Sequence, residues 1–276
     1  MQSLPKLFVR TLALAGTAMA ASVPAKAGVG DLLVAPTRIV LDGRTGSEII
    51  LNNIGDGPAT YRISVELRRM NADGRLEEVT TPSAADKMAQ EMIIYSPRRV
   101  TLAPNQPQSI RIAARAPQGL ADGEYRVHLL FRAIPDAKPV AAAAPADTPK
   151  GLSFAITPIY GVTIPVIVRL GQLQVKAGIA NVHLAQQDGK KAVGLDLIRS
   201  GQRSTFGEVR VLKPGVKDPI AIQRSVAVYT DVGSRKLVIP VSEEFKGDLR
   251  GPVTVQYVET MLEGNRTIAE TQAVLQ

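Results

Sequence analysis

Apolar and polar residues alternate along much of this chain, and one stretch holds the alternation far longer than an ordinary strand. From Leu152 to Arg169 every even-numbered position is apolar, while the odd-numbered positions are mostly small, polar or charged. A period of two predicts a β-strand, because successive side chains point to opposite faces of a sheet. A strand usually has about five or six residues, so we expect this one to leave a domain or to link two. Pro158 and Pro165 lack an N–H donor, which predicts a sheet edge or a bend there.

Most of the remaining chain consists of short runs rich in Val, Ile and Leu. Asp42-Gly43, Asp56-Gly57 and Asp73-Gly74 are candidate two-residue hairpin turns between such runs. The only good helical fragment is the short stretch from Ser83 to Glu91. In the second half, strand-like runs cover residues 173–187, 191–199, 206–214, 221–230, 235–241 and 251–259. The spacing predicts an all-β fold made of two β-sandwiches.

The first 27 residues have the features of a secretory signal peptide. Lys6 and Arg10 form a basic start, residues 12–21 form a short apolar run, and Ala25-Lys26-Ala27 is a small-residue cleavage site. The apolar run is too short to cross a bilayer, so we expect an exported protein that is not embedded in the membrane. We divide the rest into domains at 28–169 and 170–276. The Ala- and Pro-rich residues 135–151 are interpreted as a mobile loop within a hairpin, with an interdomain linker as the alternative.

Composition narrows the possible functions. The chain has no cysteine, so its stability must come from core burial rather than from disulfides. Three of the 33 basic residues lie in the signal peptide, which leaves a net charge of +5 and no dense basic run. Nucleic-acid binding is therefore disfavoured. The two histidines, His128 and His183, belong to no cluster with metal-ligand spacing, and no nucleophile elbow or phosphate loop is present. We predict a protein that is not an enzyme and has no cofactor or metal.

Several fragments, taken in order behind a signal peptide, resemble the PapD-like periplasmic chaperones of the chaperone/usher pathway. The strongest match is the stretch TRIVLDG, from Thr37 to Gly43, which is similar to the first strand of that family. The later matches are Pro97, Arg99, Leu102-x-Pro104, Ser109 to Ile112, Glu124 and Ile134-Pro135. The resemblance covers nearly all of the chain after the signal peptide, and the second-domain stretches suggest the archaic-type branch.

The resemblance implies a fold and a function. The fold would be two immunoglobulin-like domains in a boomerang arrangement. The protein would bind incomplete pilus or fimbrial subunits in the periplasm and deliver them to an outer-membrane usher without ATP. The last strand of the first domain would lend alternate apolar side chains to the subunit, in the mode of strand addition. In this chain those donors would be Phe154, Ile156 and either Pro158 or Ile159.

The family also anchors the subunit's C-terminal carboxylate on two basic residues. Arg38 matches the first by position in the TRIVLDG strand. The second falls near Thr163, which carries no charge, so this chain departs from the pattern. Either Arg98, Arg99 or Arg126 substitutes for the missing base, or the anchoring differs.

An interdomain ion pair is implied for Glu124, Arg169 and Asp248. Without the resemblance, the long strand would be interpreted as an ordinary core strand, and Arg38 as an arginine at the surface. A secreted structural or adhesive β-sandwich protein, such as a pilus component itself, remains the alternative function. Co-expression with a subunit separates the two, because a chaperone gives a soluble one-to-one complex and a pilin gives polymers.

Overall fold

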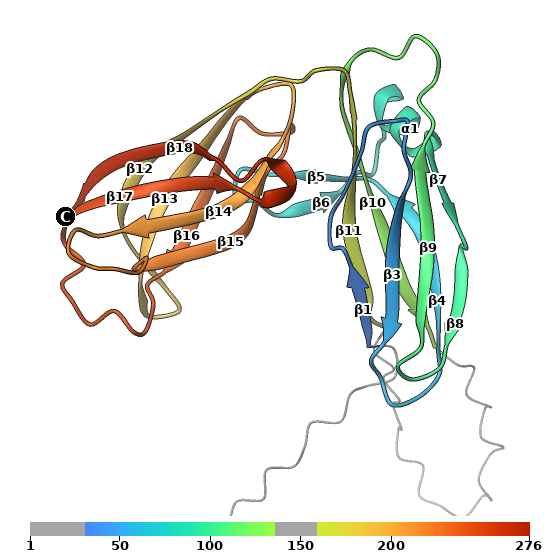
Figure 1. Cartoon of the computed structure of the whole chain (residues 1–276), viewed down its shortest axis with the longest axis horizontal. Coiled ribbons are helices and arrows are strands. Elements are labelled where there is room, and N and C mark those ends of the chain that lie inside the picture. Colours follow the sequence, from blue (N-terminus) through green and yellow to red (C-terminus); the bar gives the residue numbers. More distant parts are fainter. Residues whose placement is uncertain (1–30, 136–158) are drawn as a thin grey trace, which may run out of the picture.

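A computed structural model describes residues 31–135 and 159–276. Its elements form two β-sandwiches that meet at an angle near one end of each, which confirms the predicted all-β boomerang (Figure 1). The signal peptide and the predicted donors Phe154, Ile156 and Pro158 lie outside the described residues. The domain boundaries at 27/28 and 169/170 therefore stay predictions.

The first sandwich has the strand order of an immunoglobulin-like domain. One sheet has the order β1-β3-β9-β7 and the other β2-β11-β10-β4-β8, which correspond to the two immunoglobulin sheets with their first strand divided between them. The strands are β1 Leu32–Ala35, β2 Ile39–Leu41, β3 Ser47–Asn53, β4 Ala59–Glu66, β7 Ile93–Ser96, β8 Arg99–Leu102, β9 Pro107–Ala114, β10 Gly123–Ile134 and β11 Gly161–Leu170.

A hairpin and a helix are inserted between β4 and β7. The hairpin pairs β5 Arg68–Met70 with β6 Leu76–Glu78, and its turn contains Gly74 at a φ of 80°. It extends across the junction to the second sandwich (Figure 1), where the Lys236 amide donates to the Ala72 carbonyl at 2.8 Å. The helix α1 spans Ala84–Glu91. The predicted first residue, Ser83, is its N-cap and forms a capping box with Asp86.

The second sandwich packs a sheet of order β12-β13-β16 on one of order β15-β14-β17-β18. Its elements are β12 Val175–Gln187, β13 Lys190–Gly201, β14 Thr205–Leu212, β15 Ala221–Val228, β16 Ser234–Pro240, β17 Gly251–Glu259, the 3-10 helix η1 Met261–Glu263 and β18 Thr267–Leu275. Every strand expected in this half is present. The sequence interpretation did not predict β18, whose alternation is interrupted by the polar residues of TIAETQAVL.

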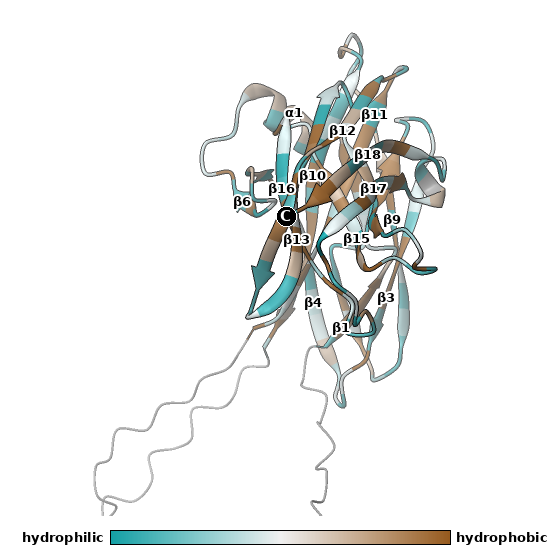
Figure 2. Ribbon diagram, turned by 90° about the vertical axis from the view of Figure 1, so that its left-hand side faces the viewer, coloured by the Kyte–Doolittle hydropathy of each residue, from teal (hydrophilic) through white to brown (hydrophobic). Residues whose placement is uncertain are grey.

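Each sandwich has an apolar interior of its own. Figure 2 shows apolar residues along central strands such as β10 and β11, whereas the loops are more hydrophilic. A third, small cluster lies where the sandwiches meet, and it joins Met70 and Ile167 of the first to Ala227 and Tyr229 of the second. The junction is therefore a packed interface that includes the β5–β6 hairpin. Among the residues that the structure describes, no helix has the length and apolar character needed to cross a membrane.

Candidate functional site

The strand β11 has different neighbours along its length. It pairs with β10 over its whole length, from Gly161 to Leu170. On its other side it pairs with β2 only at Val166–Val168. In the described part of the chain, no strand covers that second side between Gly161 and Pro165. Ile159, the one predicted donor that the structure describes, lies just before this open edge and is exposed. An open edge offers backbone N–H and C=O groups to another chain.

Arg38 lies directly before β2 and is buried at the junction rather than exposed at a rim. Its guanidinium lies over the Phe206 ring at 4.5 Å from the centroid. One of its nitrogens, Nη2, is 3.4 Å from Ser204 Oγ and 3.3 Å from Glu263 Oε1. The other two, Nε and Nη1, are buried without a hydrogen-bond partner among the described residues. Unpartnered buried donors are costly and call for an explanation.

Arg126, on strand β10 on the other side of β11 from β2, is the second arginine of this kind. It donates to the Arg68 carbonyl at 2.9 Å and forms an ion pair with Asp231. Its Nε and Nη1 are also buried without a partner in the described part of the chain. The ring of Tyr229 lies 3.9 Å from the guanidinium carbon of Arg126 and 5.8 Å from that of Arg38. Both arginines therefore lie near one aromatic ring, and four of their N–H-bearing nitrogens have no acceptor among the described residues.

The other candidates for the second base lie elsewhere. Arg99 is on β8, which is the opposite edge strand of the sheet from β2, and is exposed. Arg98 is also exposed, and its guanidinium lies over the Tyr95 ring at 5.3 Å. Thr163 pairs with Leu130 in the open half of β11. Of the three arginines considered, only Arg126 lies with Arg38 near Tyr229.

Glu124 and Arg169 do form an ion pair, with Arg169 Nε 3.0 Å from Glu124 Oε2. Both residues belong to the first sandwich, where they are a cross-strand pair of β10 and β11. They cross the junction through other partners. The same Glu124 oxygen accepts from the Ser204 amide and hydroxyl at 2.9 Å each, and Arg169 holds both oxygens of Glu263 at 2.6 and 3.2 Å.

Asp248, the third residue implied for this ion pair, is not part of it. One of its carboxylate oxygens accepts from the Arg250 amide at 3.0 Å in the turn before β17. Glu263 takes the place expected for Asp248. The sequence did not predict Glu263 or Ser204 as residues of this site, because each lies in a turn outside any apolar pattern. Their approach to the first sandwich also depends on how the two sandwiches meet.

The junction is strongly charged for a buried site. Glu263 lies within 3.5 Å of Arg203 as well, and Arg203 also binds Glu259 at 2.9 Å. Burial alone would raise the pKa of Glu263, but the hydrogen bonds and charge of Arg169, with Arg38 and Arg203, lower it below its ordinary value. Glu263 is therefore ionised at neutral pH. Two arginines beside aromatic rings, with N–H donors that have no partner among the described residues, are suited to a carboxylate. The described residues contain no group of three or more metal-ligating side chains.

Comparison with known proteins gives only distant similarities. No family model matches the chain, and no curated protein sequence matches it. Among solved structures, the CupB2 chaperone of Pseudomonas aeruginosa is 13% identical with a TM-score of 0.47, over 88% of this chain and 100% of that one. The E. coli chaperone DraB is 16% identical with a TM-score of 0.45, over 91% of this chain and 99% of that one. A chain of the CsuC–CsuE chaperone–subunit complex of archaic Csu pili of Acinetobacter baumannii is 12% identical with a TM-score of 0.43, over 89% of this chain and 98% of that one. These identities and TM-scores are too low to assign the chain to a family.

Proposed function

We propose that this protein is a periplasmic chaperone that binds incomplete pilus subunits by lending them a strand, and that passes them to an outer-membrane usher. One observation carries the proposal: β11 is covered by β2 only over Val166–Val168, and its edge is open before that point. A subunit that lacks a strand can add its own backbone to such an edge. The alternating side chains of residues 152–160 would then fill its groove.

The two arginines at Tyr229 supply a reason for specificity. We assign the C-terminal carboxylate of the subunit to Arg38 and Arg126, whose nitrogens without a partner among the described residues can donate to it. Arg126 thus takes the place of the basic residue that is missing near Thr163. A carboxylate held by charged donors in a desolvated site gains about 1.5–3 kcal/mol per hydrogen bond. The function needs binding and release only, with no catalytic group.

The test is co-expression with a pilin subunit from the same genome. We expect a soluble one-to-one complex in the periplasm, with the chaperone's N-terminus at Gly28 or within a few residues of it. Phe154→Asp and Ile156→Asp should abolish the complex and leave the melting temperature of the free chaperone unchanged. Each substitution removes about 1.5–3 kcal/mol of burial free energy from the complex. The new carboxylate also has no partner in an apolar groove.

Two results would contradict the proposal. Polymers in place of a one-to-one complex would favour the alternative, a structural pilus component. A loss of thermal stability in Phe154→Asp and Ile156→Asp would show that these residues belong to the chaperone's own core.

A subunit with three glycines added after its last residue provides the matched control for the anchor. Its displaced carboxylate should weaken binding to the wild type but not to an Arg38→Ala, Arg126→Ala double variant.

A further inference from the structure

Glu263 places a carboxylate of the chain itself beside Arg38. The side chain is only 4% exposed. Its distances to the two arginines of the first sandwich differ: the shortest N–O distance is 2.6 Å to Arg169 and 3.3 Å to Arg38. The short contact to Arg169 is a close ion pair, whereas the contact to Arg38 is near the limit for a hydrogen bond. Glu263 therefore neutralises Arg38 without using most of its donors.

The segment that carries Glu263 is joined to the first sandwich by this side chain. The hydrogen bonds that the η1 turn makes to that sandwich all come from the Glu263 carboxylate, in the described part of the chain. The turn's backbone bonds are largely internal, such as Glu263 N to the Thr260 carbonyl at 2.9 Å. Met261 is 85% exposed, and Gly264 has a φ of 119°. A turn with so few anchors can shift without breaking the core.

The other arginines do not depend on Glu263 alone. Arg169 also has Glu124 at 3.0 Å, and Arg203 has Glu259 at 2.9 Å. Arg38 has no second carboxylate among its hydrogen-bond and ion-pair partners in the described chain. A second carboxylate on the free donors of Arg38 would lie close to Glu263, and two like charges in a partly buried site repel strongly.

We propose that Glu263 is a built-in competitor for the carboxylate site. It compensates the charge of Arg38 while the site is empty, and it lowers the affinity for an incoming carboxylate until it releases Arg38 and stays paired with Arg169 and Arg203. This inference rests on the proposed function, since it concerns the same site. Its consequence is that an acidic side chain that ties the two sandwiches together also sets how tightly a subunit carboxylate is held.

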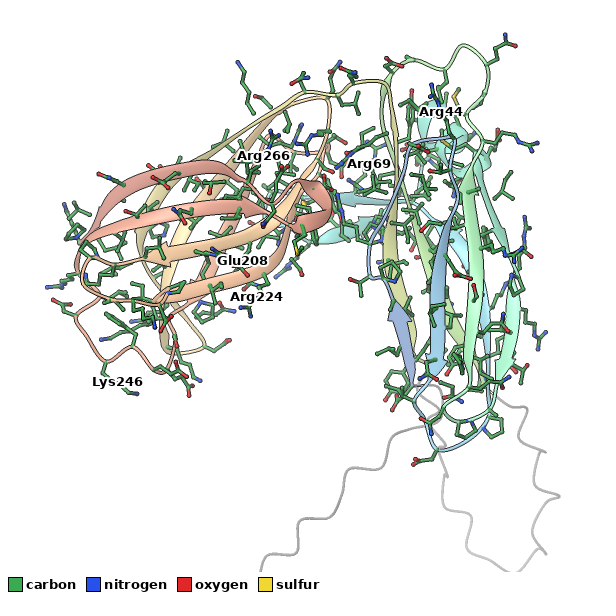
Figure 3. The ribbon with its side chains drawn as sticks, in the orientation of Figure 1. Arg44, Arg69, Glu208, Arg224, Lys246 and Arg266 are labelled. Atoms are coloured by element: carbon green, nitrogen blue, oxygen red, sulfur yellow. The ribbon has the colours of Figure 1, made fainter. Side chains whose placement is uncertain are left out.

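The experiment is an NMR titration with acetate as the carboxylate probe. The side-chain Nε–H signals of Arg38 and Arg126 are observed with ¹⁵N labelling and assigned with Arg38→Lys and Arg126→Lys variants. In Glu263→Gln, both signals should respond at roughly tenfold lower acetate than in the wild type, because the repelling charge is gone. Glu208→Gln is the matched control. Glu208 also binds two arginines, Arg210 and Arg224, and lies on the second sandwich away from the junction (Figure 3). The arginine signals of Glu208→Gln should respond to acetate at the same concentration as those of the wild type.

The outcomes separate the two proposals. If neither arginine signal responds to acetate in any variant, the carboxylate site itself is wrong. If both respond equally in the wild type and in Glu263→Gln, the site stands and the competitor role is overturned. Should Glu263→Gln fail to fold, Glu263→Asp keeps the charge for Arg169 but shortens the reach to Arg38. An acetate response between those of the wild type and the expected tenfold gain would support the proposal, and an unchanged response would contradict it.

Discussion

The residues just before β11 and the part of β11 that β2 covers belong to one alternating stretch but have different surroundings. Val166 and Ile167 have strands on both sides and are fully buried. Before the strand begins, Ile159 and Tyr160 are 47% and 54% exposed, and the first residues of β11 have a neighbour only on the β10 side. Alternation indicates that a segment is a strand. The strands beside it determine whether its backbone edge is already paired or is open to a partner.

The largest effect is expected in the covered half. Val166→Asp places a carboxylate among the buried apolar side chains of the first sandwich. A buried, unpaired charge together with lost apolar burial is expected to cost more than about 4 kcal/mol, enough to unfold the domain. Thermal unfolding followed by circular dichroism measures this.

Tyr160→Asp is the control for that substitution. Its side chain is more than half exposed, so the melting temperature should hardly change. Equal destabilisation by the two substitutions would remove the distinction between the exposed residues before β11 and its covered part.

An intermediate effect is expected at His128, which pairs with Pro165 where the two halves of β11 meet. The imidazole is fully buried, and neither nitrogen has a hydrogen-bond partner among the described residues. Burial, with the nearby charges of Arg126 and Arg68, lowers the pKa of His128 to about 3. Below about pH 6.5 the unfolded chain binds a proton that the folded chain does not. Stability should therefore fall on acidification toward pH 3, by about 1.4 kcal/mol per pH unit from this group.

Urea unfolding at pH 7.5 and pH 4.5 tests the histidine. The loss of stability between these pH values should be smaller in His128→Leu than in the wild type by about 2–3 kcal/mol. His183 is exposed, so His183→Leu should behave as the wild type does. An identical pH dependence in His128→Leu and the wild type would show that His128 is charged or solvated in the folded protein.

The smallest effect on stability is expected at Ile159, at the exposed end of the comparison. Ile159→Asp should change the free energy of unfolding by no more than about 0.5 kcal/mol, as for an ordinary surface position. Its effect on subunit binding fixes the register of the donor segment. Lost binding means that Ile159 enters the groove, whereas unchanged binding assigns the third donor to Pro158.

The sequence alone determined the class of fold and most of its strands. Alternation from Gly161 to Leu170, the hairpin turn at Asp73-Gly74, and Ser83 at the start of α1 correspond to the observed elements. These features are local, because strand period, turn geometry and helix capping depend on residues a few positions apart. The turns expected at Asp42-Gly43 and Asp56-Gly57 are not hairpin turns, because each joins strands of different sheets. Glu124 and Arg169, which the resemblance implied for an interdomain ion pair, pair with each other within the first sandwich.

The tertiary structure alone decided the content of the junction. Arg126 could not be chosen over Arg98 and Arg99 from the sequence, since all three are arginines in strand-like stretches. The choice depends on which strand lies beside β11 and on the position of Tyr229, more than a hundred residues further along the chain. That Glu263 rather than Asp248 pairs with Arg169 at the junction also depends on how distant segments pack. Charges that meet across two sandwiches are brought together by packing between distant segments, and no period within either segment records that contact.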